Sequence, residues 1–234
     1  MSLKEGLLPN KGKNLEIETG FGKYLRYPVK THVVKSGDSL KEIMDSYVKP
    51  YLEEGDAVFI SEKIVAISQG RAFKLEDIKV SPLAKFLSRF VQKTSYGIGL
   101  GMPETMQLAI NDIGRPKILF AAFCSALTKP FGKRGVFYNI VGPKGRAIDG
   151  PCDYTLPPYN KYAKLAPKDP DKVAVELKEY LGHTVIIVDA NDIGCNVLGF
   201  SDNNFTEEQC AAIFKDNPLG QGSQQTPIAI VRKA

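Results

Sequence analysis

The chain has 234 residues, 43% of them apolar, and a net charge of +5, so it can bury a substantial core in one large domain or two small ones; we expect one. No run approaches the ~18 apolar residues of a membrane span, and the first residues lack the apolar core of a signal peptide, which predicts a cytoplasmic protein. The positive charge is spread along the sequence, which favours an acidic small-molecule substrate over a nucleic acid.

The first third of the chain predicts an amino-terminal arm followed by alternating elements. Residues 1–23 are polar and Gly-rich, as expected of an extended arm or an edge strand. A helix is predicted after Asp38, because apolar side chains recur on one stripe over residues 40–51. Strands are predicted over residues 57–60 and over residues 63–71.

The middle of the chain gives weaker signals. Residues 85–93 predict a short amphipathic helix and residues 106–113 another, whereas residues 118–126 suit a helix or a strand equally well. A strand is predicted over residues 136–141. The basic run at residues 129–134 could clamp a phosphate or a carboxylate, although a charged hairpin tip is the more common role of such a run.

The last third predicts a capped helix followed by a buried strand. Asp169 can cap a helix that begins at Pro170, and Gly182 can end it. Residues 185–188 are all β-branched, which indicates a strand covered on both faces and broken at Asp189. Ligands collect outside the carboxyl ends of such strands, so Asp189 is a candidate ligand of a metal or substrate. The remaining predicted elements are a helix over residues 206–216 and a strand over residues 226–231.

Strands alternate with helices throughout, which predicts the α/β (mixed α+β) class with a mixed sheet and covering helices. The cysteines show no Cys-x-x-Cys spacing and only two histidines accompany them, so we expect reduced thiols and no zinc site. Cys152, close to Asp149, is more simply an ordinary buried thiol than a nucleophile, because neither histidine stands beside it in sequence.

Five segments in a fixed order resemble the coenzyme F-420:γ-glutamyl ligases. They are Ser61–Arg71, Ala147–Asp149, Lys168–Asp171 before the strand ending at Asp189, Gly220-Gln221, and Pro227–Arg232. The resemblance covers residues 27–71 and 145–232, while residues 72–144 match poorly and are expected to form an insert-like region within a single domain spanning residues 1–234. It implies a γ-glutamyl-ligase-like fold, a homodimer, and the addition of L-glutamate to a deazaflavin acceptor through a γ-linked amide, using GTP (or ATP) and Mg²⁺ or Mn²⁺.

The resemblance also implies site residues. Its metal positions are Asp149, Asp189 and Gln221, whose oxygen atoms suit a hard divalent cation. Its nucleotide positions fall in two segments. The segment at residues 31–34 is expected to act mainly through its backbone, and the segment at residues 220–223 is rich in glycine, so that the backbone amides of this second segment could approach phosphate. These positions are Thr31, His32, Val33 and Val34, together with Gly220, Gln221, Gly222 and Ser223.

Several departures from the family pattern leave three hypotheses open. Asp149 is followed by Gly-Pro-Cys152, whereas the family carries Ser-Asn two residues after its aspartate. Ala190 follows Asp189 in place of threonine, and Ile67 stands where a nucleotide-facing lysine is expected. The first hypothesis is a metal- and nucleotide-dependent ligase, whose acceptor could also be pterin-like or folate-like; the second is a non-catalytic homologue that binds metal, nucleotide or a metabolite. The third is a nucleic-acid binder, which only the net positive charge supports. No membrane partner is expected.

Aspartates at strand ends and loops are more often turn or cap residues than metal ligands, and a mutational test distinguishes the two roles. If Asp149 and Asp189 share one metal, changing either to Asn should remove most metal affinity and stabilise the metal-free protein. Turn residues would instead lose stability and leave metal affinity unchanged.

Overall fold

The computed structural model describes residues 7–91, 99–133, 135–192 and 194–234. Its contacts divide the chain into two compact units. The first, here called the sheet unit, combines Met1–Gly70 with Pro167–Ala234, and the second, the helical unit, is Arg71–Ala166. No helix in the described part of the chain is long and apolar enough to cross a bilayer.

A six-stranded mixed sheet forms the centre of the sheet unit, in the order β1-β2-β8-β3-β6-β7. β3 and β6 are parallel, and every other neighbouring pair is antiparallel. This arrangement confirms the predicted mixed α+β class. The strands are β1 Glu16–Thr19, β2 Gly22–Val29, β3 Ala57–Ser61, β6 Thr184–Asn191, β7 Gly194–Phe200 and β8 Ile228–Lys233.

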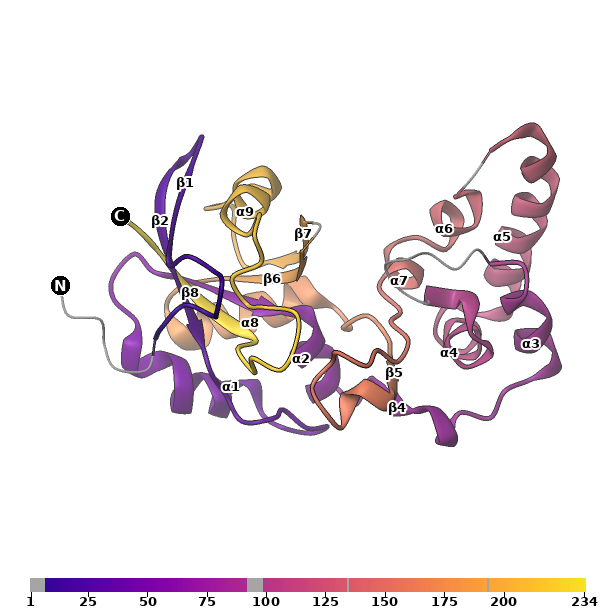
Figure 1. Cartoon of the computed structure of the whole chain (residues 1–234), viewed down its shortest axis with the longest axis horizontal. Helices are drawn as coiled ribbons and strands as arrows, with labels where there is room; N and C mark the ends of the chain where they lie inside the picture. Colours follow the sequence, from indigo (N-terminus) through magenta and orange to yellow (C-terminus); the bar gives the residue numbers. More distant parts are fainter. Residues whose placement is uncertain (1–6, 92–98, 134, 193) are drawn as a thin grey trace. The chain divides into compact units, whose positions relative to one another are not determined.

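Helices cover both faces of this sheet (Figure 1). α9 (Glu207–Ile213) packs on one face, where Phe59 of β3 stacks on Phe214 with ring centroids 4.5 Å apart. On the other side lie α1 (Leu40–Ile43), α2 (Glu62–Ser68) and α8 (Pro170–Leu181). α1 runs on as a π-helix to Val48 and a 3₁₀ turn to Tyr51, so the helix predicted over residues 40–51 is confirmed.

The helical unit is built mainly from short helices around its own apolar core. The core includes Leu100, Met106 and Ile118, none of which is exposed. A two-stranded antiparallel sheet, β4 (Ala72–Lys74) with β5 (Tyr162–Lys164), completes the unit. Its helices are α3 Pro82–Ser88, α4 Pro103–Ile113, α5 Arg115–Thr128, α6 Val136–Val141 and α7 Pro143–Arg146, with 3₁₀ turns at Leu75–Asp77, Gly99–Gly101, Lys129–Phe131 and Tyr159–Lys161.

Two strand predictions are wrong because packing overrode local β propensity. Residues 63–71 contain the helix α2, which Ser61 caps by accepting a hydrogen bond from the Lys63 amide. Residues 136–141 form α6 between two glycines, and Phe137 and Val141 lie on its buried face. Their spacing of four residues is helical, and it outweighed the β-branched ends of the segment.

Three other predictions need correction. The basic run at residues 129–134 is no hairpin tip: its described residues follow α5 and include a 3₁₀ turn at Lys129–Phe131, while residue 134 lies outside the described residues. Asp169 occupies the cap position of α8 but in left-handed conformation, φ 47°, and its side chain makes no cap hydrogen bond. The strand predicted to break at Asp189 runs on to Asn191, so Asp189 lies inside β6. Residues 92 and 93 of the predicted helix over 85–93 are outside the described residues.

Candidate functional site

The register of the sheet brings several predicted site segments to one edge. Ser61 at the end of β3 pairs with Val188 of the parallel strand β6, and Asp189 follows directly. β8 runs antiparallel to both β3 and β2, so Ile228 at its start pairs with Ile60 on one side and with Val29 on the other. The carboxyl ends of β2, β3 and β6 therefore meet the loop that precedes β8, and the sheet unit gathers its candidate residues at this edge.

The first predicted nucleotide segment is tied directly to the loop before β8. The Gln225 side chain donates from Nε2 to the Thr31 carbonyl over 2.6 Å, and the Thr31 amide donates to the Gln225 carbonyl over 3.2 Å. Gln225 has φ 62°, an uncommon backbone conformation for a residue with a side chain. The first segment is thus held against the loop that contains the second, although 194 positions separate Thr31 from Gln225.

His32 in this segment is held by two side chains. Its Nε2 lies 2.9 Å from Asp38 Oδ2, and its Nδ1 lies 3.2 Å from the Tyr47 hydroxyl. Asp38 also accepts the Lys35 amide, and this bond, with that from His32, lowers the pKa of the Asp38 carboxyl. The ring is therefore oriented, while the neighbouring Val34 is buried and can offer only its backbone.

The second predicted nucleotide segment is a compact loop, and part of its hydrogen-bonding capacity is already used. The Gly220 amide donates to the Asn217 carbonyl, and the Gly222 amide donates to Gln224 Oε1 over 2.7 Å. The amides of Gln221 and Ser223 have no hydrogen-bond partner among the described residues. Two of the four predicted amide donors thus remain for an anion.

Gly220 has a specific structural reason to be glycine. Its φ is 75°, and a Cβ there would lie 2.6 Å from the Gln224 side chain. A residue with a side chain would be strained in this conformation and would also displace Gln224, which holds the Gly222 amide. Glycine therefore allows the compact form of this loop.

The two predicted metal positions in the sheet unit lie on neighbouring parts of this edge. Asp189 is half-buried and pairs across the hairpin with Asn196 of β7. Gln221 accepts the Asp192 amide through Oε1 over 3.1 Å, which connects the loop before β8 to the turn after β6. Lys13 binds the same turn through Asp192, so the amino-terminal arm also contacts this edge.

Asp149, the third predicted metal position, belongs to the helical unit. Its backbone pairs with Lys164 in an isolated antiparallel bridge, with both N–H···O distances at 2.9 Å. The ammonium of Lys164, which is buried, lies 3.5 Å from Asp149 Oδ2. Sequence reasoning missed this lysine, because fifteen positions separate it from Asp149 and only tertiary pairing brings it there.

These contacts decide how well the donors suit a divalent cation. Carboxylate and amide oxygens are the ligands that Mg²⁺ and Mn²⁺ prefer. The described residues contain no group of three or more His, Cys, Asp or Glu side chains that could hold a metal ion. The donors of the sheet unit fit the chemistry, whereas Asp149 already has a cationic neighbour, and the three-ligand metal site stays a prediction.

The Lys168–Asp171 motif serves the structure of the sheet unit. Gln69 forms two hydrogen bonds with the Lys168 backbone, one from Nε2 to the carbonyl and one from the amide to Oε1. Asp171 accepts the Phe200 amide, which joins the start of α8 to the end of β7. At Gly199 a Cβ would lie 2.5 Å from the backbone carbon of Pro170, so the helix and the strand are in close contact.

A hollow of about 280 Å³ lies between β7 and α9 on the sheet unit. Glu207 and Glu208 line it, which makes it unsuited to an anionic nucleotide. Cys195 lines it as well, and burial above all raises the pKa of this thiol to about 12. The thiol is therefore not a nucleophile at neutral pH. All four cysteines are free, as expected.

Comparison with known proteins identifies the family. The family model described as F420-0:Gamma-glutamyl ligase matches residues 28–196, a range that includes Asp149 and Asp189 and ends before Gly220. An uncharacterized protein of Methanocaldococcus jannaschii is 29% identical over an alignment of 187 residues, and the match covers 74% of this chain. The chain spans 60% of the length of that relative. Because the family match covers well over half of its residues, this chain belongs to the F420-0:gamma-glutamyl ligase family.

Proposed function

We propose that this protein is a metal- and nucleotide-dependent ligase that forms a γ-glutamyl amide bond between L-glutamate and a carboxylate-bearing acceptor. The acceptor is coenzyme F-420-like or another metabolite of similar chemistry, and the nucleotide is GTP or ATP. Membership of the ligase family supports the reaction class. The observation that carries the nucleotide proposal is the pair of hydrogen bonds between Thr31 and Gln225, which ties the first nucleotide segment to the loop that also carries the second.

Amide formation from a carboxylate needs activation, because hydroxide is a poor leaving group. In the proposed reaction an acceptor carboxylate oxygen attacks the terminal phosphorus of the nucleotide, and the nucleoside diphosphate leaves. The glutamate amine then attacks the acyl phosphate carbon, phosphate leaves, and the amine loses a proton. The protein must therefore bind a polyanion and hold two substrates in position.

The chain's own residues suit the binding of that polyanion in two ways. The amides of Gln221 and Ser223, which have no partner among the described residues, can donate to phosphate oxygens, and the resemblance implies further backbone contacts from the Thr31–Val34 segment. Asp189 and Gln221, with Asp149 as the resemblance implies, would hold Mg²⁺ or Mn²⁺, which when bound neutralises phosphate charge.

The proposal is tested by turnover of the full-length protein. Mass spectrometry should detect an acceptor whose mass has increased by one glutamyl residue when L-glutamate, nucleotide, Mn²⁺ and coenzyme F-420 precursor, folate or pterin acceptors are supplied. Release of phosphate should require both glutamate and acceptor. Asp189→Asn should lower the rate by about a hundredfold or more, since an anionic ligand is lost from the reacting centre.

Asp77→Asn is the matched control, because Asp77 is exposed and has no ion-pair partner among the described residues. It should leave the rate unchanged. Binding of nucleotide without turnover for every acceptor would instead favour the non-catalytic alternative, and turnover that Asp189→Asn does not affect would contradict the site.

A further inference from the structure

The helical unit exposes an apolar surface that its own fold does not need. Five large apolar side chains along α5 and the turn after it are each about half or more exposed, up to 81% for Phe131. At 100° per residue, those within α5 lie within about one third of the helix circumference, so they form a continuous stripe. This apolar ridge consists of Leu119, Phe120, Phe123, Leu127 and Phe131.

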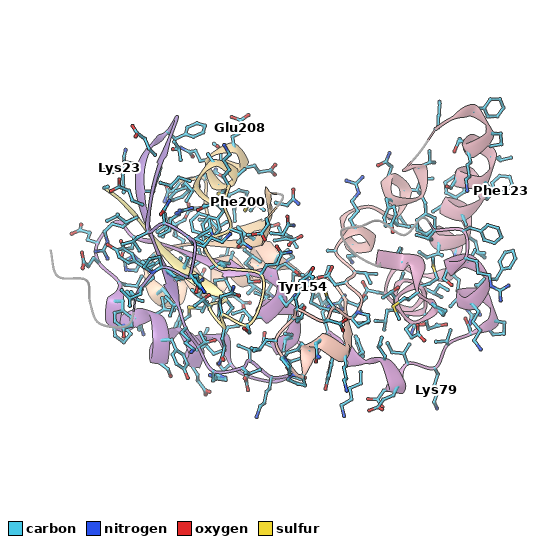
Figure 2. All side chains as sticks on the ribbon, viewed as in Figure 1. Lys23, Lys79, Phe123, Tyr154, Phe200 and Glu208 are labelled. Atoms are coloured by element: carbon cyan, nitrogen blue, oxygen red, sulfur yellow. The ribbon has the colours of Figure 1, made fainter. Side chains whose placement is uncertain are left out.

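The composition of α5 is inverted relative to an ordinary surface helix. Its fully buried positions are Ile118 and Ala121, whereas its phenylalanines point outward. Figure 2 shows Phe123 on the outer side of α5. An aromatic side chain presents about 200 Å² of surface, so the three phenylalanines of the ridge leave about 400 Å² in water. Contiguous patches of this size on a folded protein usually mark an interaction site.

The charged residues of the chain segment that carries the ridge all have the same sign. No Asp or Glu occurs between Asp112 and Asp149, and exposed basic side chains flank the ridge at both ends. Those side chains are Arg115 and Lys117 before it and Lys129 and Lys133 after it. Over the whole helical unit, fifteen Lys and Arg outnumber six Asp and Glu, a net charge of +9. The surface therefore complements an anionic partner.

A second site on the same unit repeats this combination. Phe86 and Phe90 are both more than half exposed, and their rings lie 5.0 Å apart. Lys85, Ser88 and Arg89 line a shallow hollow of about 520 Å³ on the same helical segment. Apolar rings beside a basic, hydroxyl-bearing hollow match a phospholipid, whose headgroup is anionic and whose chains are apolar.

We propose that the helical unit binds the surface of an anionic membrane, with the apolar ridge inserted at the headgroup boundary and the flanking basic side chains on the lipid phosphates. α5 has 14 residues, too few to cross a bilayer, so the helix lies in the interface. Two copies packed ridge to ridge would bring like charges together, which disfavours a second copy as the occupant. None of the residues of this surface belongs to the proposed ligase site, and the proposal departs from the expectation that no membrane is bound.

Sedimentation of the full-length protein with vesicles tests this proposal. Vesicles of phosphatidylcholine and phosphatidylserine, mixed about two to one, should bind it at least about tenfold more tightly than phosphatidylcholine alone, and salt should weaken binding. The double variant Phe120→Ser, Phe123→Ser should lose most of this binding. Phe21→Ser is the matched control, because Phe21 is 42% exposed on the sheet unit, and it should bind as the unchanged protein does.

A fluorescence measurement distinguishes insertion from simple charge attraction. The chain has no tryptophan, so Phe123→Trp introduces a single reporter, and Phe21→Trp is its control. Emission should move to shorter wavelength on mixed vesicles for Phe123→Trp only.

Circular dichroism of each variant confirms that it is folded. Absence of binding to mixed vesicles would overturn the proposal. So would equal binding by the double serine variant, or a dimer that this variant dissociates without any vesicle binding, which would assign the ridge to a second copy. An acidic protein as the occupant would likewise leave the vesicles unbound.

Discussion

The two units of this protein differ in net charge and in the kind of surface that each offers to a partner. The sheet unit carries sixteen Lys and Arg against twenty Asp and Glu, a net charge of −4, and holds its candidate residues at one sheet edge through strand register. The helical unit has a net charge of +9 and exposes large apolar side chains. The net charge of the whole chain, +5, is the sum of these two values and conceals both. The kind of partner that each unit can bind must therefore be inferred from that unit's own charge.

The buried charges of the sheet unit reinforce this contrast. Arg232 binds Asp56 through two hydrogen bonds of 2.7 Å each and also binds Glu53, and these contacts raise the pKa of its guanidinium further. Arg26, almost fully buried, pairs with Asp216. These largely buried cationic groups thus stabilise the fold of the sheet unit, whereas the basic side chains that flank the apolar ridge face solvent.

Replacing phenylalanine with alanine should lower stability strongly in the sheet unit and hardly at all on the ridge of the helical unit. Phe59→Ala should lower the free energy of unfolding by about 3–5 kcal/mol, because the ring is fully buried between Phe205 and Phe214. Phe123→Ala should change it by no more than about 0.5 kcal/mol, because the ring is 61% exposed. Urea unfolding of both variants measures the difference, and a loss above about 2 kcal/mol for Phe123→Ala would mean that the ridge is covered.

Close packing of β7 against α8 predicts a smaller loss of stability when a side chain is added at Gly199. Gly199→Ala should cost about 1–3 kcal/mol, since its Cβ would meet the Pro170 backbone, which cannot rotate away as a side chain can. Gly194→Ala in the same strand is the matched control, because nothing lies within 4 Å of the added Cβ. Thermal unfolding of both variants checks this prediction, and equal melting temperatures would show that the helix and strand are not in contact.

Stability should fall at alkaline pH because of two buried thiols. Burial raises the pKa of Cys195 and Cys210 to about 12, so only the unfolded chain loses these protons as pH rises above about 9. The unfolded state then binds fewer protons, and stability decreases between about pH 9 and 12 by on the order of 1 kcal/mol per pH unit for each of the two thiols. Replacing both cysteines with alanine should flatten this part of the pH profile; an unchanged slope would assign it to other groups.

The smallest effect concerns Asp149, where the structure reverses the expected sign of the stability change on neutralisation. Neutralising this carboxylate was expected to stabilise the metal-free protein by relieving repulsion, but its neighbour is the ammonium of the buried Lys164. Asp149→Asn should therefore destabilise the metal-free protein, by about 1 kcal/mol, because the carboxylate is largely exposed and solvent screens the pair. Chemical denaturation in the presence of a chelator measures this change, and stabilisation would show that repulsion between carboxylates dominates instead.

Local sequence signals predicted the elements that depend on neighbouring residues. The helix that begins at Pro170 and ends before Gly182, and the buried strand after it, are confirmed because a proline at the first helical position, a glycine at the end and an apolar run are all local signals, although Asp169 makes no cap bond. α2 and α6 were wrongly predicted as strands, because their β-branched residues are accommodated in helices by burial against neighbouring elements.

Only part of the candidate site could be predicted from the sequence. Family resemblance named Thr31 and Gln221, but the mutual hydrogen bonds of Gln225 with Thr31 depend on the pairing of β2 with β8, two strands far apart in sequence. The apolar ridge was missed because apolar residues at helical spacing are expected to face the core, and no local pattern indicates that α5 buries alanine and exposes phenylalanine.

Calorimetric titration of GTP or ATP into the full-length protein, with and without Mn²⁺, tests most directly whether the sheet edge binds nucleotide. The account predicts weak binding that requires the metal and that Asp189→Asn reduces by about tenfold or more, while Asp77→Asn has no effect. Tight binding in the presence of a chelator, or metal-dependent binding that Asp189→Asn leaves unchanged, would contradict it.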